Sequence, residues 1–327
     1  MVENNARRIL EKAVVEQVYD IYLQAKTNGY EIYFRNAQAR FLVKKLDEAT
    51  GQALIAHFKF CAGLNVGERR RTQLGACWYE LSVGGRRLRL SSVGDFEGRE
   101  SLVIRILHEA AAKLDFWLDD EQRLSKLICR RGLYLFAGPV GSGKTSLMFE
   151  LARRHFSGRQ VMTIEDPVEL VEEDFVQLQV NEVIGNNYEE LIKLSLRHRP
   201  ELLIVGEIRD SRTARAVLRA SLTGHTVFST IHARSIRGVW ARLLELGLSE
   251  WEIKSSLQAV VYQRLIAGKG LVDIAEDNFE KWTTAQWNKK ITRLASDGHL
   301  GAAEVETEKI ESGKADEIDS AHGKFAE

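Results

Sequence analysis

The chain has few of the features that would assign it to a class at once. Only three of its 327 residues are prolines and three are cysteines. Cys61, Cys77 and Cys129 lie far apart, without the spacing of zinc ligands or of a disulfide framework, so we expect three reduced thiols and no zinc site. No run of about 18 to 20 apolar residues is present that could cross a membrane, and the polar start MVENNARR is unlike a signal peptide. The sequence therefore predicts a cytoplasmic protein.

An excess of charge of one sign is also absent. The chain carries 46 Lys and Arg against 46 Asp and Glu, a formal net charge of +0. A balanced chain has no global attraction for nucleic acid, so we expect no direct nucleic-acid binding beyond what a local basic patch would give. With 44% hydrophobic and 28% charged residues, the composition is that of a globular protein, and the length predicts two domains.

The first third of the sequence, residues 1–110, reads as a small α+β domain. Apolar residues at helical spacing predict a helix over residues 3–18, and two strand-like segments, 20–26 and 31–35, are separated by a turn signal around Gly29. We expect a helical segment over residues 39–62 and then short strands joined by glycine-rich turns up to residue 93.

From residue 120 to residue 270 the pattern changes. The apolar runs LYLFA, VMTI, LLIVG and HTVFSTI alternate with helical patterns, which predicts a mainly parallel sheet with crossover helices. We place a linker at residues 111–119. After residue 270 the apolar density falls, so residues 271–327 are expected to form a helical segment and a polar tail that is mobile from about residue 302.

The strongest motif is GPVGSGKT at residues 138–145, between an apolar strand and a helical pattern. It matches the phosphate-binding P-loop, in which backbone N–H groups at a helix N-terminus surround phosphate oxygens. We expect Lys144 to reach the β- and γ-phosphates of ATP and Thr145 to ligate Mg²⁺. The alternative is a glycine-rich connecting turn. The predicted nucleotide-binding residues of this segment are Gly138, Pro139, Val140, Gly141, Ser142, Gly143, Lys144, Thr145 and Ser146.

Two further strands end in acids. PELLIVGEIRD places Glu207 at the end of a strand, where a P-loop sheet directs a carboxylate at Mg²⁺ or at the attacking water. VMTIEDPVE similarly ends in Glu165 and Asp166, which would supply a second carboxylate to polarise water. The alternative for this second pair is two solvated loop acids.

His225 and His232 flank the strand in TGHTVFSTIHA. Their separation of roughly 23 Å along an extended strand excludes a shared metal ion. Each is a candidate for sensing the γ-phosphate or a subunit boundary, and the alternative is a structural role. We count His225 among the nucleotide-binding residues and His232 among the catalytic ones.

Four segments in order, GPVGSGKT, IEDPVE, LRHRPELLIVGEIRD and TGHTVFSTIHA, resemble the Walker A, Asp box, Walker B and His box of the secretion traffic ATPases that drive type II secretion, type IV pili and competence pseudopili. HFKFCAGLNVGERRRTQLG, RLRLSS, LVIRIL and VVYQRLI extend the resemblance to roughly residues 15–268. It implies a PAS-like N-terminal domain linked to a RecA-like ATPase domain. It also implies a hexamer under an inner-membrane platform protein, at the inner face of the membrane.

The resemblance also bears on the subfamily and on two arginines. The four-cysteine motif of many assembly ATPases and the AIRNLIRE-like motif of retraction ATPases are absent from the sequence, so the chain looks most like the competence ATPases of Gram-positive bacteria. Arg89 and Arg105 stand where the family keeps arginines that reach the γ-phosphate. The alternative is that they belong to a charged surface. Two other functions stay open: a RecA-like DNA translocase and a nucleotide-binding scaffold without turnover.

Overall fold

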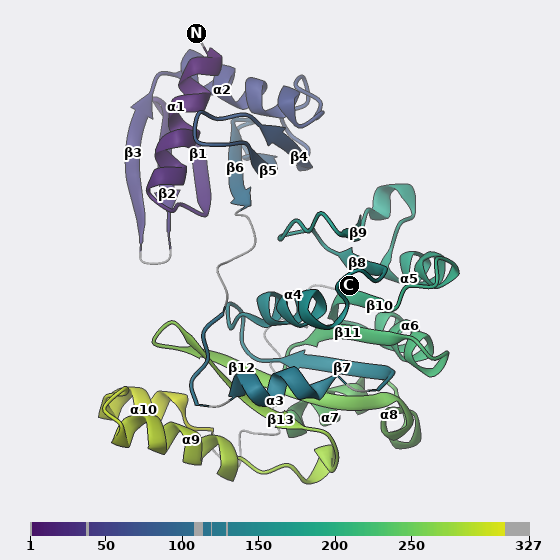
Figure 1. Ribbon diagram of the computed structural model, residues 1–327. Helices are drawn as coiled ribbons and strands as arrows, with labels where there is room; N and C mark the ends of the chain where they lie inside the picture. Colours follow the sequence, from purple (N-terminus) through teal and green to yellow (C-terminus); the bar gives the residue numbers. More distant parts are fainter. Residues whose placement is uncertain (1, 37–38, 108–113, 119, 129, 311–327) are drawn as a thin grey trace. The chain divides into compact units, whose positions relative to one another are not determined.

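The computed structural model describes residues 2–36, 39–107, 114–118, 120–128 and 130–310, and it divides into two compact units, Met1–Glu109 and Ala110–Glu327 (Figure 1). Each unit has its own sheet and its own hydrophobic core. In the part of the chain that the structure describes, no helix is both long and apolar enough to span a membrane.

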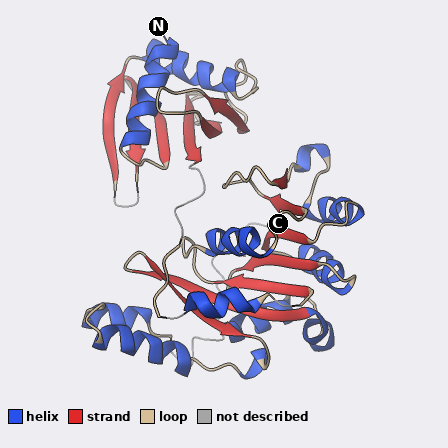
Figure 2. Ribbon diagram, viewed as in Figure 1, coloured by secondary structure: helices blue, strands red, loops and turns tan. Residues whose placement is uncertain are grey.

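The first unit is a six-stranded antiparallel sheet with two helices, in the strand order β3-β2-β1-β6-β5-β4 (Figure 2). Burial alternates along β5 and β6, so one face of the sheet is covered and the other is exposed. The elements are α1 (Val2–Val15), β1 (Asp20–Lys26), β2 (Gly29–Arg35), β3 (Arg40–Leu46), α2 (Glu48–Cys61), β4 (Gln73–Tyr79), β5 (Arg86–Gly94) and β6 (Glu100–Leu107).

The prediction of a helix over residues 39–62 is wrong for its first part. Residues 40–46 form the edge strand β3, whose side chains alternate between exposed and half-buried positions. The helix α2 begins only at Glu48, where the Asp47 side chain accepts a hydrogen bond from the Thr50 amide at 2.8 Å. The Asp47 N-cap was the signal for this boundary, whereas RFLVKKL itself has only a weak two-residue period.

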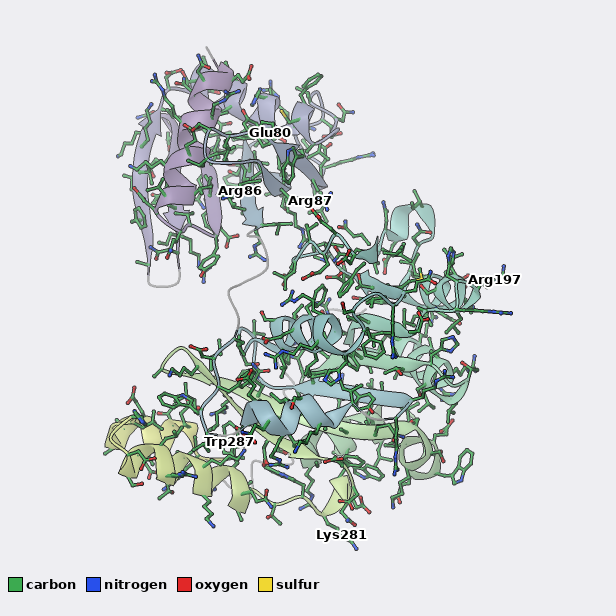
Figure 3. The ribbon with its side chains drawn as sticks, viewed as in Figure 1. Glu80, Arg86, Arg87, Arg197, Lys281 and Trp287 are labelled. Carbon is green, nitrogen blue, oxygen red and sulfur yellow. The ribbon has the colours of Figure 1, made fainter. Side chains whose placement is uncertain are left out.

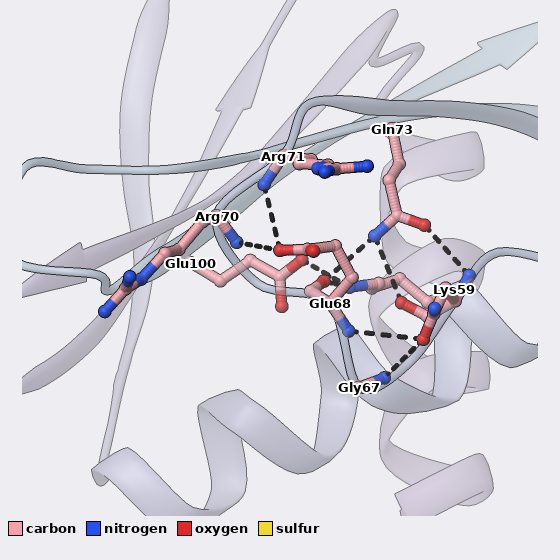
Figure 4. Close-up of polar contacts among 8 residues, drawn as sticks. Lys59, Gly67, Glu68, Arg70, Arg71, Gln73 and Glu100 are labelled. Carbon is pink, nitrogen blue, oxygen red and sulfur yellow. Dashed lines mark hydrogen bonds and ion pairs between the residues drawn. The ribbon is translucent and has the colours of Figure 1, made fainter.

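A buried lysine anchors the loop that carries Arg69, Arg70 and Arg71 (Figure 4). Lys59 is fully buried, and its Nζ donates to the Glu100 carboxylate and to the Glu68 carbonyl, each at 2.6 Å. The Glu68 carboxylate accepts the backbone N–H groups of Arg70 and Arg71 in turn. Since a buried charge needs both a partner and hydrogen bonds, this network fixes the loop to the sheet.

The second unit is built on a seven-stranded sheet in the order β13-β12-β7-β11-β10-β8-β9, parallel except for the β12–β13 hairpin. The strands β7, β8 and β11 are buried on both faces, as a sheet with helices on both sides requires. Its strands are β7 (Gly132–Ala137), β8 (Val161–Glu165), β9 (Phe175–Gln179), β10 (Leu202–Ile208), β11 (Thr226–Ile231), β12 (Leu257–Ile266) and β13 (Lys269–Ala275).

Helices cover both faces of this sheet (Figure 1). One core contains α3, α4 and side chains such as Phe136 and Phe228, and the other contains α5 to α9 with Leu135 and Val205. The helices are α3 (Asp120–Leu127), α4 (Lys144–His155), α5 (Tyr188–Arg197), α6 (Ser211–Leu222), α7 (Ile236–Glu245), α8 (Glu250–Ser256), α9 (Ala285–Ser296) and α10 (Ala302–Glu308), with 3₁₀ turns at Glu182–Ile184 and Phe279–Lys281.

Part of the predicted linker packs against the sheet of the second unit. Residues 108–113 and 119 lie outside the described residues, but 114–118 bind along the β12–β13 hairpin. The amide of Trp117 donates to the carbonyl of Gly270 at 2.8 Å, and the Trp117 indole donates to the carbonyl of Ile266 at 2.8 Å. The strand β13 also continues the sheet beyond residue 270, where the composition placed a boundary.

The expectation of mobile chain from residue 302 is wrong for residues 302–310. Residues 302–308 form α10, and Ile310 is buried in the core. Trp287, fully buried on α9 (Figure 3), donates its indole N–H to the carbonyl of Glu308 at 2.8 Å. Polar composition concealed this contact because α10 docks through a few dispersed contacts, among them Val305 packed on the core and two hydrogen bonds between the Asn288 side chain and the Ile310 backbone.

Candidate functional site

The phosphate loop lies between β7 and α4, at the carboxyl end of a buried strand. Gly138, Gly141 and Gly143 all have positive φ angles, 141°, 78° and 83°. A Cβ on Gly138 would lie 2.1 Å from the carbonyl oxygen of Gln263, so no other residue fits at this position. Gly143 is the left-handed N-cap of α4, whose first amides therefore open toward the loop. This is the backbone arrangement that binds phosphate at a helix N-terminus.

Lys144 closes the loop. It is 8% exposed, and its Nζ donates to the carbonyls of Gly138 at 2.9 Å and Pro139 at 2.7 Å. Burial lowers the pKa of Lys144 to about 8, against the opposing attraction of Glu207. The ammonium is thus poorly solvated and in reach of the loop, so an anion in the loop would gain a strong partner.

Glu207 lies near the end of β10 with its two oxygens in different environments. Oε1 accepts a hydrogen bond from Arg209 at 2.5 Å. Oε2 is buried and has no hydrogen-bond partner in the described structure, with His232 Nε2 3.7 Å away. A buried carboxylate oxygen without a donor is costly unless a cation or a donor from a ligand reaches it.

Glu165 ends β8 and is 4% exposed. Its Oε1 accepts hydrogen bonds from Thr163 Oγ1 at 2.5 Å and Gln177 Nε2 at 3.0 Å. Burial raises the pKa of Glu165, and the two hydrogen bonds oppose that rise. The carboxylate is therefore held in one orientation by neighbours that stabilise its charged form.

These side chains share one cavity of about 300 Å³ because β7, β8, β10 and β11 are parallel and their carboxyl ends meet at one edge of the sheet. Its lining residues are Val140, Gly141, Lys144, Thr145, Glu165, Asp166, Pro167, Glu169, Tyr188, Gly206, Glu207, Arg209, Thr230 and His232.

The structure brings most, not all, of the predicted residues together. Lys144, Thr145, Glu165, Glu207 and His232 line the same cavity. The assignment of His225 to the nucleotide site is a misplacement: His225 precedes β11, at the amino edge of the sheet, and lines a different cavity. One strand separates the two histidines, as the spacing predicted, and that separation is the reason only one of them is at the site.

Arg89 and Arg105 lie in the first unit, on β5 and β6. They are directly opposite each other in the antiparallel register, on the face of the sheet away from the buried Leu88 and Leu90. Arg105 Nε donates to the Asp20 carboxylate at 2.7 Å, with half of its side chain exposed. Their role toward a nucleotide stays a prediction.

Several lining residues carried little or no signal in the sequence. Tyr188 comes from the start of α5, and burial raises its pKa, so the phenol stays protonated. Thr230 donates to the carbonyl of Gly206 at 2.7 Å and so joins β11 to β10 beside Glu207. Arg209 and Thr230 were detectable as neighbours of the motifs, whereas nothing near Tyr188 marks it.

Comparison with known proteins gives consistent matches. A model of the type II/IV secretion system protein family matches residues 1–314. The chain is 56% identical over 310 residues to competence protein ComGA of Streptococcus pneumoniae, covering 95% of this chain and 99% of that protein. It is 38% identical over 275 residues to competence protein ComGA of Bacillus subtilis, covering 81% of this chain and 76% of that protein.

Two solved structures share the fold. The crystal structure of the pilus retraction motor PilT with bound ADP aligns with a TM-score of 0.75 at 21% identity, over 93% of this chain and 97% of that one. The Legionella pneumophila ATPase DotB aligns with a TM-score of 0.71 at 19% identity, over 92% of this chain and 94% of that one. The predicted mixed α/β fold is confirmed, and the chain belongs to the type II/IV secretion system protein family.

Proposed function

We propose that this chain is an ATP-hydrolysing motor that powers assembly of a competence pseudopilus or a similar pilus-like machine. The observation that carries the proposal is the single cavity in which the phosphate loop, Lys144 and the carboxylates of Glu165 and Glu207 meet. The 56% identity to a competence protein along nearly the whole chain supports the biological setting. The resemblance of the sequence motifs to secretion ATPases supports the same reading.

The loop and α4 would bind the β- and γ-phosphates of ATP through backbone N–H groups. Lys144 would exchange its two loop carbonyls for phosphate oxygens, because a charged acceptor makes the stronger hydrogen bond. Residues 138–146 thus remain the proposed phosphate-binding segment. Ile208 and its neighbours hold Glu207 rigidly across from the loop on a buried strand.

The residues present fit Mg²⁺. Thr145 offers a hydroxyl on the first turn of α4, and Glu207 Oε2 is a buried carboxylate oxygen that lacks a donor. Both are hard oxygen ligands of the kind that Mg²⁺ prefers. When bound with ATP, the ion neutralises charge on the β- and γ-phosphates. We therefore assign Thr145 and Glu207 as its protein ligands.

Glu165 is the proposed residue that orients the attacking water, since two donors fix its carboxylate at the rim of the same cavity. His232, 3.7 Å from Glu207 Oε2, would steady that carboxylate and respond to the γ-phosphate. Arg89 and Arg105 would each bring a guanidinium group to the triphosphate, at the nucleotide site of the same chain or of a neighbouring subunit.

The remaining assignments rest on the resemblance. The two compact units would be a PAS-like domain and a RecA-like ATPase domain, joined near residue 110. Six copies would form the motor under an inner-membrane platform protein, in the cytoplasm.

Phosphate release by the full chain tests the enzyme. We expect Mg²⁺-dependent hydrolysis of ATP that Glu207→Gln abolishes while ADP binding is kept, because the substitution preserves shape and removes charge. Glu250→Gln, which changes an exposed carboxylate on α8, is the matched control and should be fully active. A folded wild-type chain that binds ATP and never releases phosphate would instead be a scaffold.

Replacement of the ComGA gene in Streptococcus pneumoniae tests the machine. The chain should restore transformation, and its Lys144→Ala form should not. Robust ATPase activity without any restoration would separate the enzyme from the competence assignment.

A further inference from the structure

A second cavity, of about 720 Å³, lies at the opposite edge of the same parallel sheet. Four connections form it, and each leads directly into a parallel strand: the segments before β7, β8, β10 and β11. The order of the parallel strands therefore brings these four segments together, just as it brings together the residues of the phosphate site. Its lining residues are Ile128, Arg130, Arg131, His155, Phe156, Arg159, Arg199, Pro200, Glu201, Thr223, Gly224, His225 and Thr226.

The lining is strongly basic. Arg130, Arg131, Arg159 and Arg199 are exposed, and none of them has an ion pair in the described structure. The guanidinium of Arg159 lies 5.9 Å from the centre of the Phe156 ring, which is nearly buried at 6% exposure. Unpaired like charges that converge on one hollow repel each other, so an anion that enters gains from all of them.

Only one carboxylate stands among them. Glu201 lines the cavity, but its Oε2 accepts the backbone N–H of Gln160 at 2.8 Å. That oxygen is engaged in joining the start of β10 to the start of β8. A single carboxylate offsets at most one of the four guanidinium charges, so the lining keeps a net positive charge.

His155 supplies an independent observation. It is the last residue of α4 and lines the cavity, and its Nε2 is buried without a hydrogen-bond partner among the described residues. Burial, aided by the charge of Arg154, lowers the pKa of the imidazole, so the ring is neutral near pH 7. A buried ring nitrogen without a partner is a cost that a hydrogen-bonding ligand removes.

The simplest structural explanation for the arginines is incomplete. The helices α4, α5 and α6 end at this edge, and cations there balance the partial negative charge of helix C-termini. Yet the side chains of the four arginines donate no hydrogen bond to any helix carbonyl within the described part of the chain. They border a cavity whose volume is in the range of sites that bind small molecules.

We propose that this amino-edge cavity binds a small anion that carries two or more phosphate groups, as a site separate from the proposed ATPase site. Planar guanidinium groups bind phosphate oxygens in pairs, and four of them match a ligand with several phosphates rather than one. The volume accommodates an inorganic polyphosphate or a nucleoside polyphosphate, which share this chemistry.

The cavity is mechanically connected to the phosphate loop. The helix α4 begins at Lys144 in the loop and ends at His155 in the cavity, a rigid span of about 18 Å. The strands β7, β10 and β11 join the same two edges. A ligand that changes the position of the α4 C-terminus would therefore act on the loop at its N-terminus.

Calorimetric titration of inorganic tripolyphosphate tests the site. The full chain is used with Lys144→Ala, so that the phosphate loop contributes little. We expect one site per chain, and Arg131→Gln and Arg199→Gln should each weaken binding by about tenfold, since each removes a charge-assisted contact. Arg197→Gln is the matched control: Arg197 is an exposed arginine two residues from Arg199, outside the cavity lining (Figure 3), and its loss should change affinity less than about twofold.

Further measurements distinguish the possible ligands of this cavity from one another and from the absence of a site. ADP or GDP that binds more tightly than tripolyphosphate, with an affinity that Arg131→Gln and Arg199→Gln both weaken, would identify a nucleotide ligand in this cavity and support the site. Absence of any binding in the folded Lys144→Ala chain would overturn it. Equal weakening by Arg197→Gln and Arg199→Gln would show diffuse attraction without a built site. A polyglutamate peptide that displaces tripolyphosphate at lower concentration would assign the surface to an acidic protein instead.

Discussion

The two edges of the central sheet use the same strands for opposite arrangements of charge. At the carboxyl edge, the acids Glu165 and Glu207 face Lys144 and Arg209 across one cavity. At the amino edge, four arginines surround a cavity with a single carboxylate. The lining of the carboxyl-edge cavity carries four carboxylates against two cations and is acidic, whereas that of the amino-edge cavity is basic.

The difference follows from the direction of the helices. Helix N-termini meet the carboxyl edge, so backbone N–H groups supply positive charge there and side chains are free to be acidic and to hold a cation. Helix C-termini meet the amino edge, where the backbone repels anions. Any anion bound at the amino edge depends on side chains alone. Substitutions should therefore act differently at the two edges.

The largest expected effect is at Lys144. Lys144→Ala should lower ATP turnover by about 10³-fold or more, because it removes the one buried ammonium in the phosphate loop. Phosphate release measured under saturating ATP checks this, with thermal melting to confirm the fold. Lys281→Ala, an exposed lysine (Figure 3), is the control and should turn over normally. Undiminished hydrolysis by folded Lys144→Ala would remove the carboxyl edge as the catalytic site.

A smaller effect tests whether the residues at the carboxyl edge are sufficient for ATP turnover without arginines from the first unit. Arg89→Ala and Arg105→Ala should each reduce turnover by about 10²-fold with little change in ADP affinity, as expected for groups that act on the transition state. Arg86→Ala, on the same strand as Arg89, should change it little. Equal and small effects at all three positions would mean that the second unit needs no arginine from the first.

The fold was predictable where burial gives the sequence a clear hydrophobic pattern. The buried strands of the second unit, such as Leu133–Ala137 and Leu202–Val205, read as continuous apolar runs because helices cover both faces. The edge strand Arg40–Leu46 was mistaken for helix because its half-buried side chains give a weak period. Docking of α10 through Ile310 depends on a surface made by α9 and β12, which no local pattern encodes.

The site was predictable where chemistry restricts residue type. Only glycine fits at Gly138, and the carboxyl ends of the parallel strands meet at the cavity, so the loop, Glu165 and Glu207 could be named from the sequence. Tyr188 arrives from α5, and the amino-edge arginines arrive from four separate connections. Their assembly follows from the strand order, which the sequence pattern did not supply.

A change in pH should separate the two edges. With the pKa of Lys144 at about 8, the ammonium is mostly charged at pH 7 and mostly neutral at pH 9, so ADP affinity at the phosphate loop should fall by about tenfold over that interval. Lys144→Arg keeps its charge throughout, and its ADP affinity should be flat over the same interval. Equilibrium titration at three pH values checks both proteins. An equally steep fall for Lys144→Arg would trace the dependence to another group.

The smallest effect concerns the orientation of Glu165. Thr163 is fully buried, and its hydroxyl donates to Glu165 at 2.5 Å, which opposes the rise in the pKa of that carboxyl caused by burial. Thr163→Val removes the donor with little change in volume, so the pKa of Glu165 should rise further and a larger share of it should be protonated in mild acid. Turnover should then fall by about two- to threefold at pH 6 and hardly at all at pH 8, as a pH profile of phosphate release would show. Thr163→Ser keeps the hydroxyl and should retain the wild-type profile. A uniform loss at both pH values, or the same profile for the serine and valine variants, would indicate a packing effect and would leave Glu207 as the acid on which catalysis at the carboxyl edge depends.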